Sequence, residues 1–427
     1  MIDVRRLRAD PDGVRAALAR RGDEAVLAAV DRVLELDRRR RELLTEAEAI
    51  KARRNTESEE VARRKRAGEP ADDLTVALKA SGERVRALDA EVREVDAGLD
   101  DALLGIPNLP LPGIPDGDAT HNRVLRTWGE PPRLDFEPRA HWDLGTALGL
   151  FDLPRGAKVT GSGFPVYTGL GARLVRALAN FMLDLHAGEH GYLEVAPPYL
   201  VNRASMTGTG QLPKFEEELY AIPLDGLYLI PTAEVPVTNL HRDEILDAAD
   251  LPRGYVAWTP CFRREAGAGG KDTRGLIRVH QFDKVELVRF CRPEDSAAEH
   301  ELLLGHAEAV LRRLGIPYRA LELAAGDTGA ASARTVDLEV WAAGVGGWLE
   351  ASSGSTFTDY QARRANIRYR PAPGAKPEFV HTLNASGVAF PRTIIALLEN
   401  NQAADGSVRV PDALARYLGT DRLVPRA

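Results

Sequence analysis

The chain has 427 residues, a formal net charge of −7 at pH 7 and two cysteines. A hydrophobic content of 44% with 28% charged residues is ordinary for a globular protein, and the length allows two or three domains. No apolar run approaches the roughly 20 residues that span a bilayer, and MIDVRRLRADPDG lacks a signal-peptide core, so we expect a cytoplasmic protein without membrane contact. Cys261 and Cys291 lack paired metal-ligand spacing, which predicts no zinc.

Two series of apolar residues with coiled-coil spacing occupy the first quarter of the chain. They cover residues 26–50 and 74–102, on either side of Gly68-Glu69-Pro70. Two such seams joined by a short turn predict an antiparallel two-helix coiled-coil arm over about 26–103. At ~1.5 Å per residue, helices of about 40 residues extend about 60 Å, which is longer than a compact domain needs.

The densest basic patch of the chain lies near the predicted tip of this arm. A negative net charge argues against wholesale coating by nucleic acid, but it allows one basic segment on an acidic body. Cationic side chains that neutralise phosphates add salt-dependent affinity, and a solvated coiled-coil surface is the alternative interpretation. The patch consists of Arg53, Arg54, Arg63, Arg64, Lys65 and Arg66, diluted by Glu57, Glu59 and Glu60.

A proline-rich stretch at 106–117 (IPNLPLPGIPDG) predicts a linker, because its prolines exclude both helix and central strand. We therefore predict a first domain over 1–110 and a second over 111–427. In the second, strands follow strands with few intervening helices, which indicates an α+β fold on an antiparallel sheet flanked by helices. No glycine-rich phosphate-binding motif follows a strand, so a nucleotide would be held by side chains on a sheet face.

The stretch 259–286 carries the strongest pattern for a polar ligand. YVAWTPCFRRE and LIRVHQFDKVELV predict two strands on either side of a glycine-rich loop at 266–275. Because side chains alternate between the two faces of a strand, Arg263 and Glu265 should share one face and Arg264 should lie on the other. A charged surface hairpin is the alternative to a ligand site. In the second strand the polar face consists of Arg278, His280, Phe282, Lys284 and Glu286.

Four other segments supply matching chemistry. In Pro231-Thr232-Ala233-Glu234 a hydroxyl and a carboxylate suit an α-amino group and a small polar side chain. The segment 348–356 (WLEASSGST) offers Glu350 with Ser352 or Ser353 as oxygen ligands for Mg²⁺. The polar turn 381–386 leads into Phe390-Pro391-Arg392, where proline suits a helix start and the arginine enters a first turn that favours anions.

Taken together and in this order, these residues resemble those of class II aminoacyl-tRNA synthetases, specifically the bacterial type of seryl-tRNA synthetase. The resemblance covers nearly the whole chain. The segments that carry it are MTGTGQLPKF (206–215), PTAEVPVTNL (231–240), CFRREAG with DTRGLIRVHQFDKVE (261–286), DYQARR (359–364), KPEFVHTLN (376–384) and RTIIALLEN (392–400).

The resemblance implies a homodimer that activates L-serine with ATP and transfers it to tRNA(Ser), and to tRNA(Sec) where that tRNA is present. Mg²⁺ would be held by Glu350 and Ser353. The dimer interface would lie around 191–200, and the arm tip would bind tRNA. Serine would be bound by Thr232, Ala233, Glu234, Glu286, Asn384 and Ser386. ATP would be bound by Arg263, Arg264, Glu265, Val279, Phe282, Glu350, Ala351, Ser352, Ser353 and Arg392.

The chain departs from the family pattern at Arg264, Gly354, Thr356 and Phe390-Pro391. A missing side chain at Gly354 would open space near the adenylate, which suggests a duplicated, inhibitor-tolerant enzyme as one alternative. A ligase that charges a carrier protein is a second alternative, although such relatives lack the long arm. A non-catalytic coiled-coil scaffold is a third, and binding of ATP and Mg²⁺ separates it from an enzyme.

Overall fold

The structure is a computed structural model that describes residues 1–266 and 273–426. By its internal contacts the chain divides into two compact units, one of residues 1–19 and 23–107 and the other of residues 20–22 and 108–427. Each unit has its own elements and buried core. None of the described helices is long and apolar enough to span a membrane.

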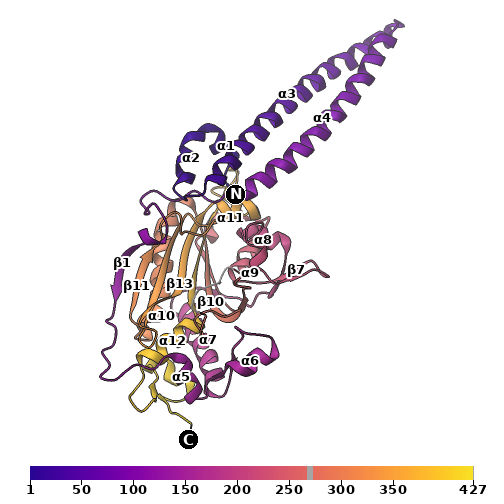
Figure 1. Cartoon of the computed structure of the whole chain (residues 1–427). Coiled ribbons are helices and arrows are strands. Elements are labelled where there is room, and N and C mark those ends of the chain that lie inside the picture. Colours follow the sequence, from indigo (N-terminus) through magenta and orange to yellow (C-terminus); the bar gives the residue numbers. More distant parts are fainter. Residues whose placement is uncertain (267–272, 427) are drawn as a thin grey trace. The chain divides into compact units, whose positions relative to one another are not determined.

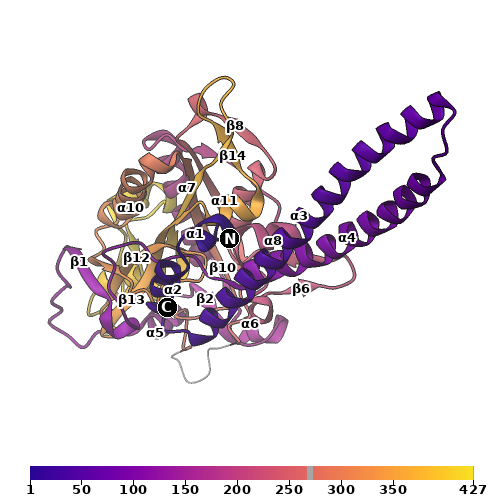
Figure 2. The same cartoon turned by 90° about the horizontal axis from the view of Figure 1, so that it is seen from above.

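The first unit is helical, and its two long helices run alongside each other in both views (Figures 1 and 2). With 44 residues, α3 is about 66 Å long. It ends where Gly68 adopts a left-handed conformation with φ 74°, a geometry that glycine adopts without a steric penalty. The predicted coiled-coil arm is thereby confirmed. The helices of this unit are α1 (Val4–Ala9), α2 (Pro11–Ala19), α3 (Glu24–Ala67) and α4 (Asp72–Gly105).

The seam between the two long helices changes character along its length. Leu43 and Ala47 pack against Leu88 in an apolar cluster. Closer to the turn, α3 presents Arg54 and Glu57 to the seam, and each has a buried polar atom without a hydrogen-bond partner among the described residues. Burial of apolar side chains therefore stabilises the part of the arm away from the turn. Closer to the turn, polar side chains enter the seam between the two helices.

The second unit is built on an eight-stranded sheet with the order β1-β11-β12-β13-β16-β10-β9-β4. Neighbouring strands are antiparallel, except that β4 runs parallel to β9. The predicted antiparallel α+β architecture is confirmed. The strands are β1 (Arg123–Trp128), β4 (Leu193–Glu194), β9 (Arg253–Phe262), β10 (Gln281–Cys291), β11 (Tyr318–Glu322), β12 (Arg334–Ala342), β13 (Gly347–Thr358) and β16 (His381–Ala389).

Three amphipathic helices cover one face of this sheet: α7 (Leu170–Gly188), α10 (Ser296–Arg313) and α12 (Phe390–Asn400). They bury one large apolar core against it, in which residues such as Leu178, Leu304 and Ile395 meet Leu287 and Leu383. Because side chains alternate along a strand, the neighbours of the last two, Glu286 and Asn384, point to the other face. The helices thus leave the opposite face of β10 and β16 to polar residues.

Shorter elements surround the sheet, and the two segments β8 and β14 lie side by side (Figure 2). The shorter helices are α5 (His141–Ala147), α6 (Leu153–Val159), α8 (Arg203–Thr209), α9 (Glu234–Thr238), α11 (Tyr360–Ala365) and α13 (Asp412–Leu418). The minor strands are β2 (Phe151–Asp152), β3 (Val166–Tyr167), β5 (Leu200–Asn202), β6 (Ala221–Ile222), β7 (Leu227–Leu229), β8 (Ile245–Asp247), β14 (Arg368–Arg370), β15 (Glu378–Phe379), β17 (Val408–Arg409) and β18 (Arg422–Leu423).

The predicted strand from residue 276 is shorter than the sequence pattern indicated, because β10 begins only at Gln281. The backbone N–H groups of Leu276 and His280 bond to the His141 ring and to the Gly163 carbonyl, at 3.0 and 2.8 Å, instead of to a neighbouring strand. Arg278 and His280 consequently lie outside the strand. Part of the predicted loop, residues 267–272, lies outside the described residues.

Candidate active site

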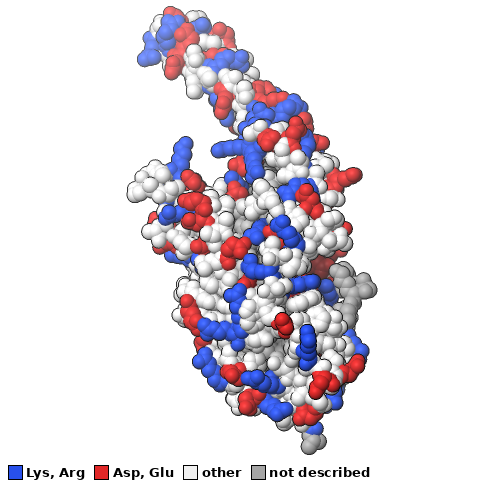
Figure 3. Space-filling view, turned by 90° about the vertical axis from the view of Figure 1, so that its left-hand side faces the viewer, with Lys and Arg blue, Asp and Glu red and all other residues white. Residues whose placement is uncertain are grey.

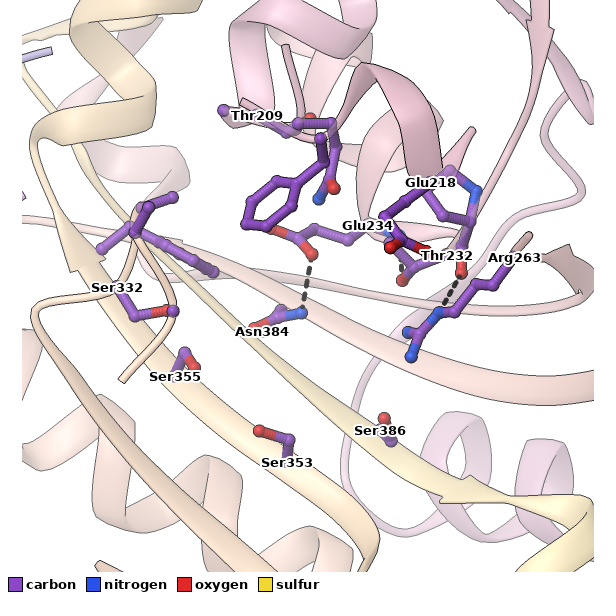
Figure 4. A pocket seen from close by; sticks show the side chains of 18 of the residues that line it. Thr209, Glu218, Thr232, Glu234, Arg263, Ser332, Ser353, Ser355, Asn384 and Ser386 are labelled. Carbon is purple, nitrogen blue, oxygen red and sulfur yellow. Dashed lines mark hydrogen bonds between the residues drawn. The ribbon is translucent and has the colours of Figure 1, made fainter. Parts of the chain in front are cut away.

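Two adjoining cavities lie on the polar face of the sheet, of about 370 Å³ and about 180 Å³. The larger is lined from α8, α9, β10, β13, β16, the segment after β9 and the loop at 329–332, and Figure 4 shows lining side chains converging on it. Both cavities are lined by Arg263, Glu265, Lys284, Glu350 and Ser386. A molecule spanning both cavities would have its central atoms at these five residues.

The buried carboxylate of Glu234 lines the larger cavity and shares a hydrogen-bond donor with a second buried carboxylate, that of Glu286. Asn384 Nδ2 donates to Glu234 Oε2 at 3.1 Å, a bond drawn in Figure 4, and to Glu286 Oε1 at 2.8 Å. Gln361 Nε2 holds the other oxygen of Glu234 at 2.6 Å. Burial, reinforced by the nearby Glu286, raises the pKa of Glu234 to about 7. This arrangement suits an ammonium group, whose charge would offset the two neighbouring carboxylates.

Lys284 lies next to the Glu286 carboxylate and is only 4% exposed. Its Nζ lies 2.8 Å from Thr232 Oγ1 and forms an ion pair with Glu286. Thr232 in turn accepts a 3.2 Å hydrogen bond from the backbone N–H of Glu234. The segment 231–234, far from β10 in the sequence, is thus tied to β10 through the lysine.

The smaller cavity combines an aromatic ring with cationic side chains. The Arg263 guanidinium lies 5.3 Å from the centre of the Phe282 ring, and its Nε donates to the Pro231 carbonyl at 3.3 Å. Glu265, in an ion pair with Arg278, has a φ of 52°, a region that residues with a side chain rarely adopt. Such a backbone at the end of a strand aims the carboxylate into the cavity instead of along the strand.

Arg392 closes this cavity from the start of α12. Pro391 occupies the first turn of that helix, as predicted, and Arg392 follows it. Its side chain donates to the backbone carbonyls of Ile277 and Glu350, at 3.2 and 2.7 Å. The guanidinium is therefore held at a helix N-terminus, beside the cavity, where an anion is favoured.

Most of the predicted serine and ATP residues line these two cavities. Glu286 is not among the lining residues but accepts a hydrogen bond from Asn384, and Ala233 is fully buried in the hydrophobic cluster beside α9. Ser352 is also buried and donates to the Ser386 carbonyl at 2.6 Å. The residues that line a cavity are Thr232, Glu234, Arg263, Glu265, Val279, Phe282, Glu350, Ala351, Ser353, Asn384, Ser386 and Arg392.

Arg264 is a correction to the predicted ATP set. Its Nη1 donates to the Glu217 carbonyl at 3.0 Å, and its backbone N–H donates to the Glu218 carbonyl at 3.0 Å. The side chain therefore points away from both cavities, as the strand alternation indicated. Any ATP contact at this position would have to come from its backbone.

Sequence reasoning did not assign a function to several cavity residues. Lys284 was placed on the correct face of its strand without one. The others received no role either, although Thr209, Gln211 and Phe215 lie in the motif at 206–215 and Ser355 lies in the segment 348–356, and only folding brings them to the site. They include Thr209, Gln211, Phe215, Glu218, Ser332 and Ser355.

The predicted Mg²⁺ ligands offer oxygen atoms on one side of the cavities. The Glu350 side chain is 48% exposed and approaches Arg392 at only 3.4 Å, which leaves carboxylate lone pairs available. Ser353 on β13 is the strand partner of Asp337 on β12. The Oδ1 atom of Asp337 is buried without a hydrogen-bond partner among the described residues. This all-oxygen set fits Mg²⁺, although the described residues include no group of three or more His, Cys, Asp or Glu side chains placed to hold a metal alone.

Gly354 does not open space at the cavities, and the prediction based on it is wrong. A Cβ built at Gly354 would lie 2.5 Å from Cδ2 of Leu304 on α10. It would therefore point to the helix-covered face, whereas Ser353 and Ser355 on either side face the cavity. The structural reason for expecting an inhibitor-tolerant enzyme is thereby removed.

The basic residues predicted at the arm tip are partly neutralised by their neighbours. Arg63 and Arg64 both pair with Glu60, and Arg53 lies 3.7 Å from Glu57. On the face seen in Figure 3, cationic and acidic side chains alternate along the arm. The patch is therefore less basic than the count of Lys and Arg suggested, with exposed Lys65 and Arg66 at its end.

Comparison with known proteins matches both units. Residues 215–401 match the family model "tRNA synthetase class II core domain (G, H, P, S and T)", and residues 1–110 match "Seryl-tRNA synthetase N-terminal domain". The serine–tRNA ligase of Gemmatimonas aurantiaca is 59% identical over 98% of this chain and 99% of its own length. That of Listeria monocytogenes is 55% identical over 98% of both chains.

Two solved structures are similar to this chain over its whole length. The seryl-tRNA synthetase from Pyrococcus horikoshii complexed with ATP has a TM-score of 0.96 and 39% identity, covering 100% of both chains. The cytoplasmic serine–tRNA ligase from Naegleria fowleri in complex with AMP has a TM-score of 0.90 and 30% identity, over 100% of this chain and 99% of its own.

Proposed function

The chain belongs to the seryl-tRNA synthetases, ligases that join serine to tRNA, and from this we propose which of its residues carry each part of the reaction. The observation that carries the proposal is the meeting of two cavities at Arg263, one with buried carboxylates and one with an aromatic ring. Serine would occupy the first cavity and ATP the second.

In the smaller cavity, the Phe282 ring would stack on adenine and Glu265 would accept from its amino group. Arg263 would hold the α-phosphate, and Arg392, held beside the N-terminus of α12, would meet the γ-phosphate. Val279 and Ala351 would supply apolar contacts to the nucleoside. The support is that these residues, distant in sequence, line one cavity.

In the larger cavity, Glu234 would receive the ammonium group of serine, with Thr232 beside it. Glu286, Asn384 and Ser386 would surround the side-chain hydroxyl. A buried site whose polar groups are left unpaired by the wrong substrate discriminates strongly, which suits the rejection of alanine and glycine.

Mg²⁺ would be held by Glu350 and Ser353 together with phosphate oxygens and water, because the protein offers few ligands of its own. When bound, it supplies positive charge that neutralises the phosphates. Glu350 would also keep Arg392 in place through the 3.4 Å contact between their side chains.

The first step joins a carboxylate oxygen of serine to the α-phosphorus while pyrophosphate departs, which forms seryl-adenylate. In the second step a terminal ribose hydroxyl of tRNA(Ser), or of tRNA(Sec) where present, takes the seryl group and AMP departs. The attacking carboxylate is already a nucleophile, so the first step needs no general base. Positioning and charge neutralisation by Arg263 and Arg392 would therefore supply most of the rate enhancement.

The arm is proposed to bind tRNA, mainly through its phosphate backbone. Exposed Lys65 and Arg66 are the residues best placed for this, since Arg63 and Arg64 already have carboxylate partners. The resulting affinity would depend on salt.

We also propose that the protein acts as a cytoplasmic homodimer whose subunits meet around residues 191–200. Three large apolar side chains in this stretch are exposed: Leu193 at 61%, Tyr199 at 45% and Leu200 at 41%. Exposed apolar groups gathered in one short segment are typical of a protein interface.

The first experiment is ATP–pyrophosphate exchange by the purified protein with serine, threonine, alanine, glycine and cysteine, without tRNA. We expect exchange with serine alone. Exchange with another amino acid, or with none, would contradict the proposed serine subsite and would favour a carrier-protein ligase or a non-catalytic scaffold.

A further inference from the structure

We propose that Lys284 binds the carboxylate of the amino acid at the junction of the two cavities, and that it is a further catalytic residue in adenylate formation. The inference rests on the proposed placement of serine and ATP. It assigns to Lys284 a direct contact with the attacking group, beyond its visible pairing with Glu286.

The position of Lys284 in the sheet places it at this junction. It lies on β10 between β9 and β16, paired with Thr259 on one side and Ala389 on the other. Its side chain lines both cavities, as does that of Arg263. Since the bond to be formed joins an atom of serine to an atom of ATP, residues common to both cavities are those nearest to that bond.

The ammonium group has a donor left for a ligand. A lysine Nζ carries three N–H groups. Among the described residues, two acceptors are assigned to it, Thr232 Oγ1 at 2.8 Å and the carboxylate of Glu286. The third N–H is available to a molecule in the cavity, and the two existing contacts fix the position from which it is donated.

The charges of the site favour such a contact. Arg263 and Lys284 are the cationic side chains that line the larger cavity within the described part of the chain, together with the carboxylates of Glu218, Glu234, Glu265 and Glu350. Arg263 lies against the Phe282 ring, and that ring lines only the nucleotide cavity. Lys284 is therefore the cation better placed for a carboxylate in the amino-acid cavity.

The contact with Lys284 would reduce the repulsion between the serine carboxylate and the α-phosphate. In adenylate formation a carboxylate oxygen forms a bond to the α-phosphorus, the bond from that phosphorus to the bridging oxygen breaks, and its electrons leave with pyrophosphate. Two anionic groups must approach each other for this to happen. The Lys284 ammonium, which is buried, keeps its proton throughout and reduces their repulsion.

The alternative is that Lys284 serves only as a counter-ion for Glu286. Two probes separate these interpretations: serine, and serinamide, which keeps the ammonium and hydroxyl groups but has no carboxylate. A lysine that contacts the carboxylate favours serine alone. A lysine that only orders Glu286 affects both molecules to the same extent.

The test compares wild type, Lys284→Met and, as a matched control, Lys158→Met, which removes an exposed lysine on α6. For each, the KM of serine in ATP–pyrophosphate exchange at pH 7 and the inhibition constant of serinamide are measured, with thermal melting to check folding. We expect Lys284→Met to raise the serine KM about 10–100-fold, the size of a lost charge-assisted hydrogen bond, and to change serinamide inhibition less than about threefold.

Equal weakening of both molecules, or no change in either, would overturn the proposal. If Lys284→Met does not fold, Lys284→Gln keeps a donor without the charge and is held to the same criterion. A failure of the proposed function is distinguishable, because the wild type itself would then show no exchange with serine.

Discussion

Gln361 Nε2 donates a 2.6 Å hydrogen bond to Oε1 of Glu234, and both side chains are buried. The same amide also donates to the Thr209 carbonyl at 3.1 Å and accepts from the Thr382 hydroxyl at 2.7 Å. With all its bonds made, the glutamine holds the carboxylate proposed to receive the ammonium group of serine. It connects α11 to the segment 231–234.

Gln361→Met should therefore weaken serine binding without affecting ATP. The carboxylate would lose a buried donor at a cost of about 1–3 kcal/mol, which corresponds to a serine KM roughly 5–150-fold higher. Steady-state exchange kinetics with each substrate varied in turn provide the measurement. Gln402→Met is a matched control, because Gln402 is equally buried but bonds to Arg139 and Glu399 away from the cavities. A similar rise in the ATP KM would show that Gln361 supports the whole fold instead.

The pKa of Glu234, raised to about 7, predicts a pH dependence of serine activation. Below about pH 7 the free enzyme carries a proton on this carboxyl group and presents no negative charge to the ammonium group. The value of kcat/KM for serine should accordingly fall as pH falls through 7, approaching tenfold per pH unit, and level off above it. Exchange rates from pH 5.5 to 8.5 test this. A flat profile over that range would mean that Glu234 does not receive the substrate ammonium.

Phe282→Leu should affect the nucleotide selectively. The substitution removes the ring proposed to stack on adenine, worth about 1–3 kcal/mol, and should raise the KM of ATP roughly 5–100-fold with little change for serine. Phe181→Leu, in the apolar core where the Phe181 ring packs against Tyr417, serves as a control that removes a ring of the same size. An unchanged ATP KM in Phe282→Leu would place the adenine elsewhere.

The arm should be dispensable for amino-acid activation. Excision of residues 27–102 should leave exchange intact and abolish charging of tRNA. A finer test replaces Lys65 and Arg66 together with Gln, which should weaken tRNA binding and reduce the slope of log affinity against log salt by about 2. The same change at Arg63 and Arg64 should have a smaller effect, since both already pair with Glu60. Equal effects of the two pairs would contradict the importance of those ion pairs.

Gly354→Ala should lower stability and leave catalysis alone. The added Cβ would meet the Leu304 side chain at 2.5 Å, an overpacking that typically costs about 1–3 kcal/mol. Denaturant unfolding should show this loss, and Gly354→Ala combined with Leu304→Val should recover part of it. Changed inhibition by a seryl-adenylate analogue in the single variant would contradict the orientation of this residue toward α10.

Local sequence patterns determined those parts of the protein that depend on residues close together in the chain. Heptad spacing alone predicted α3, α4 and the turn at Gly68, because a coiled coil buries a seam with a simple period. Alternation placed Phe282, Lys284 and Glu286 on one face of β10, and the proline before Arg392 marked the start of α12. The family resemblance could also be read from ordered motifs, and the comparisons confirm it.

Only the tertiary structure decided which side chains meet. Gln361 reaches Glu234 from 127 positions away, a pairing to which local periodicity contributes nothing. Gly354 was expected to open space near the adenylate, but it lies between Ser353 and Ser355 in a regular stretch of β13, and the packing of α10 decides what its missing side chain would touch. The late start of β10, at Gln281 and not at residue 276, also depends on tertiary contacts, since the backbone donors of Leu276 and His280 bond to other segments.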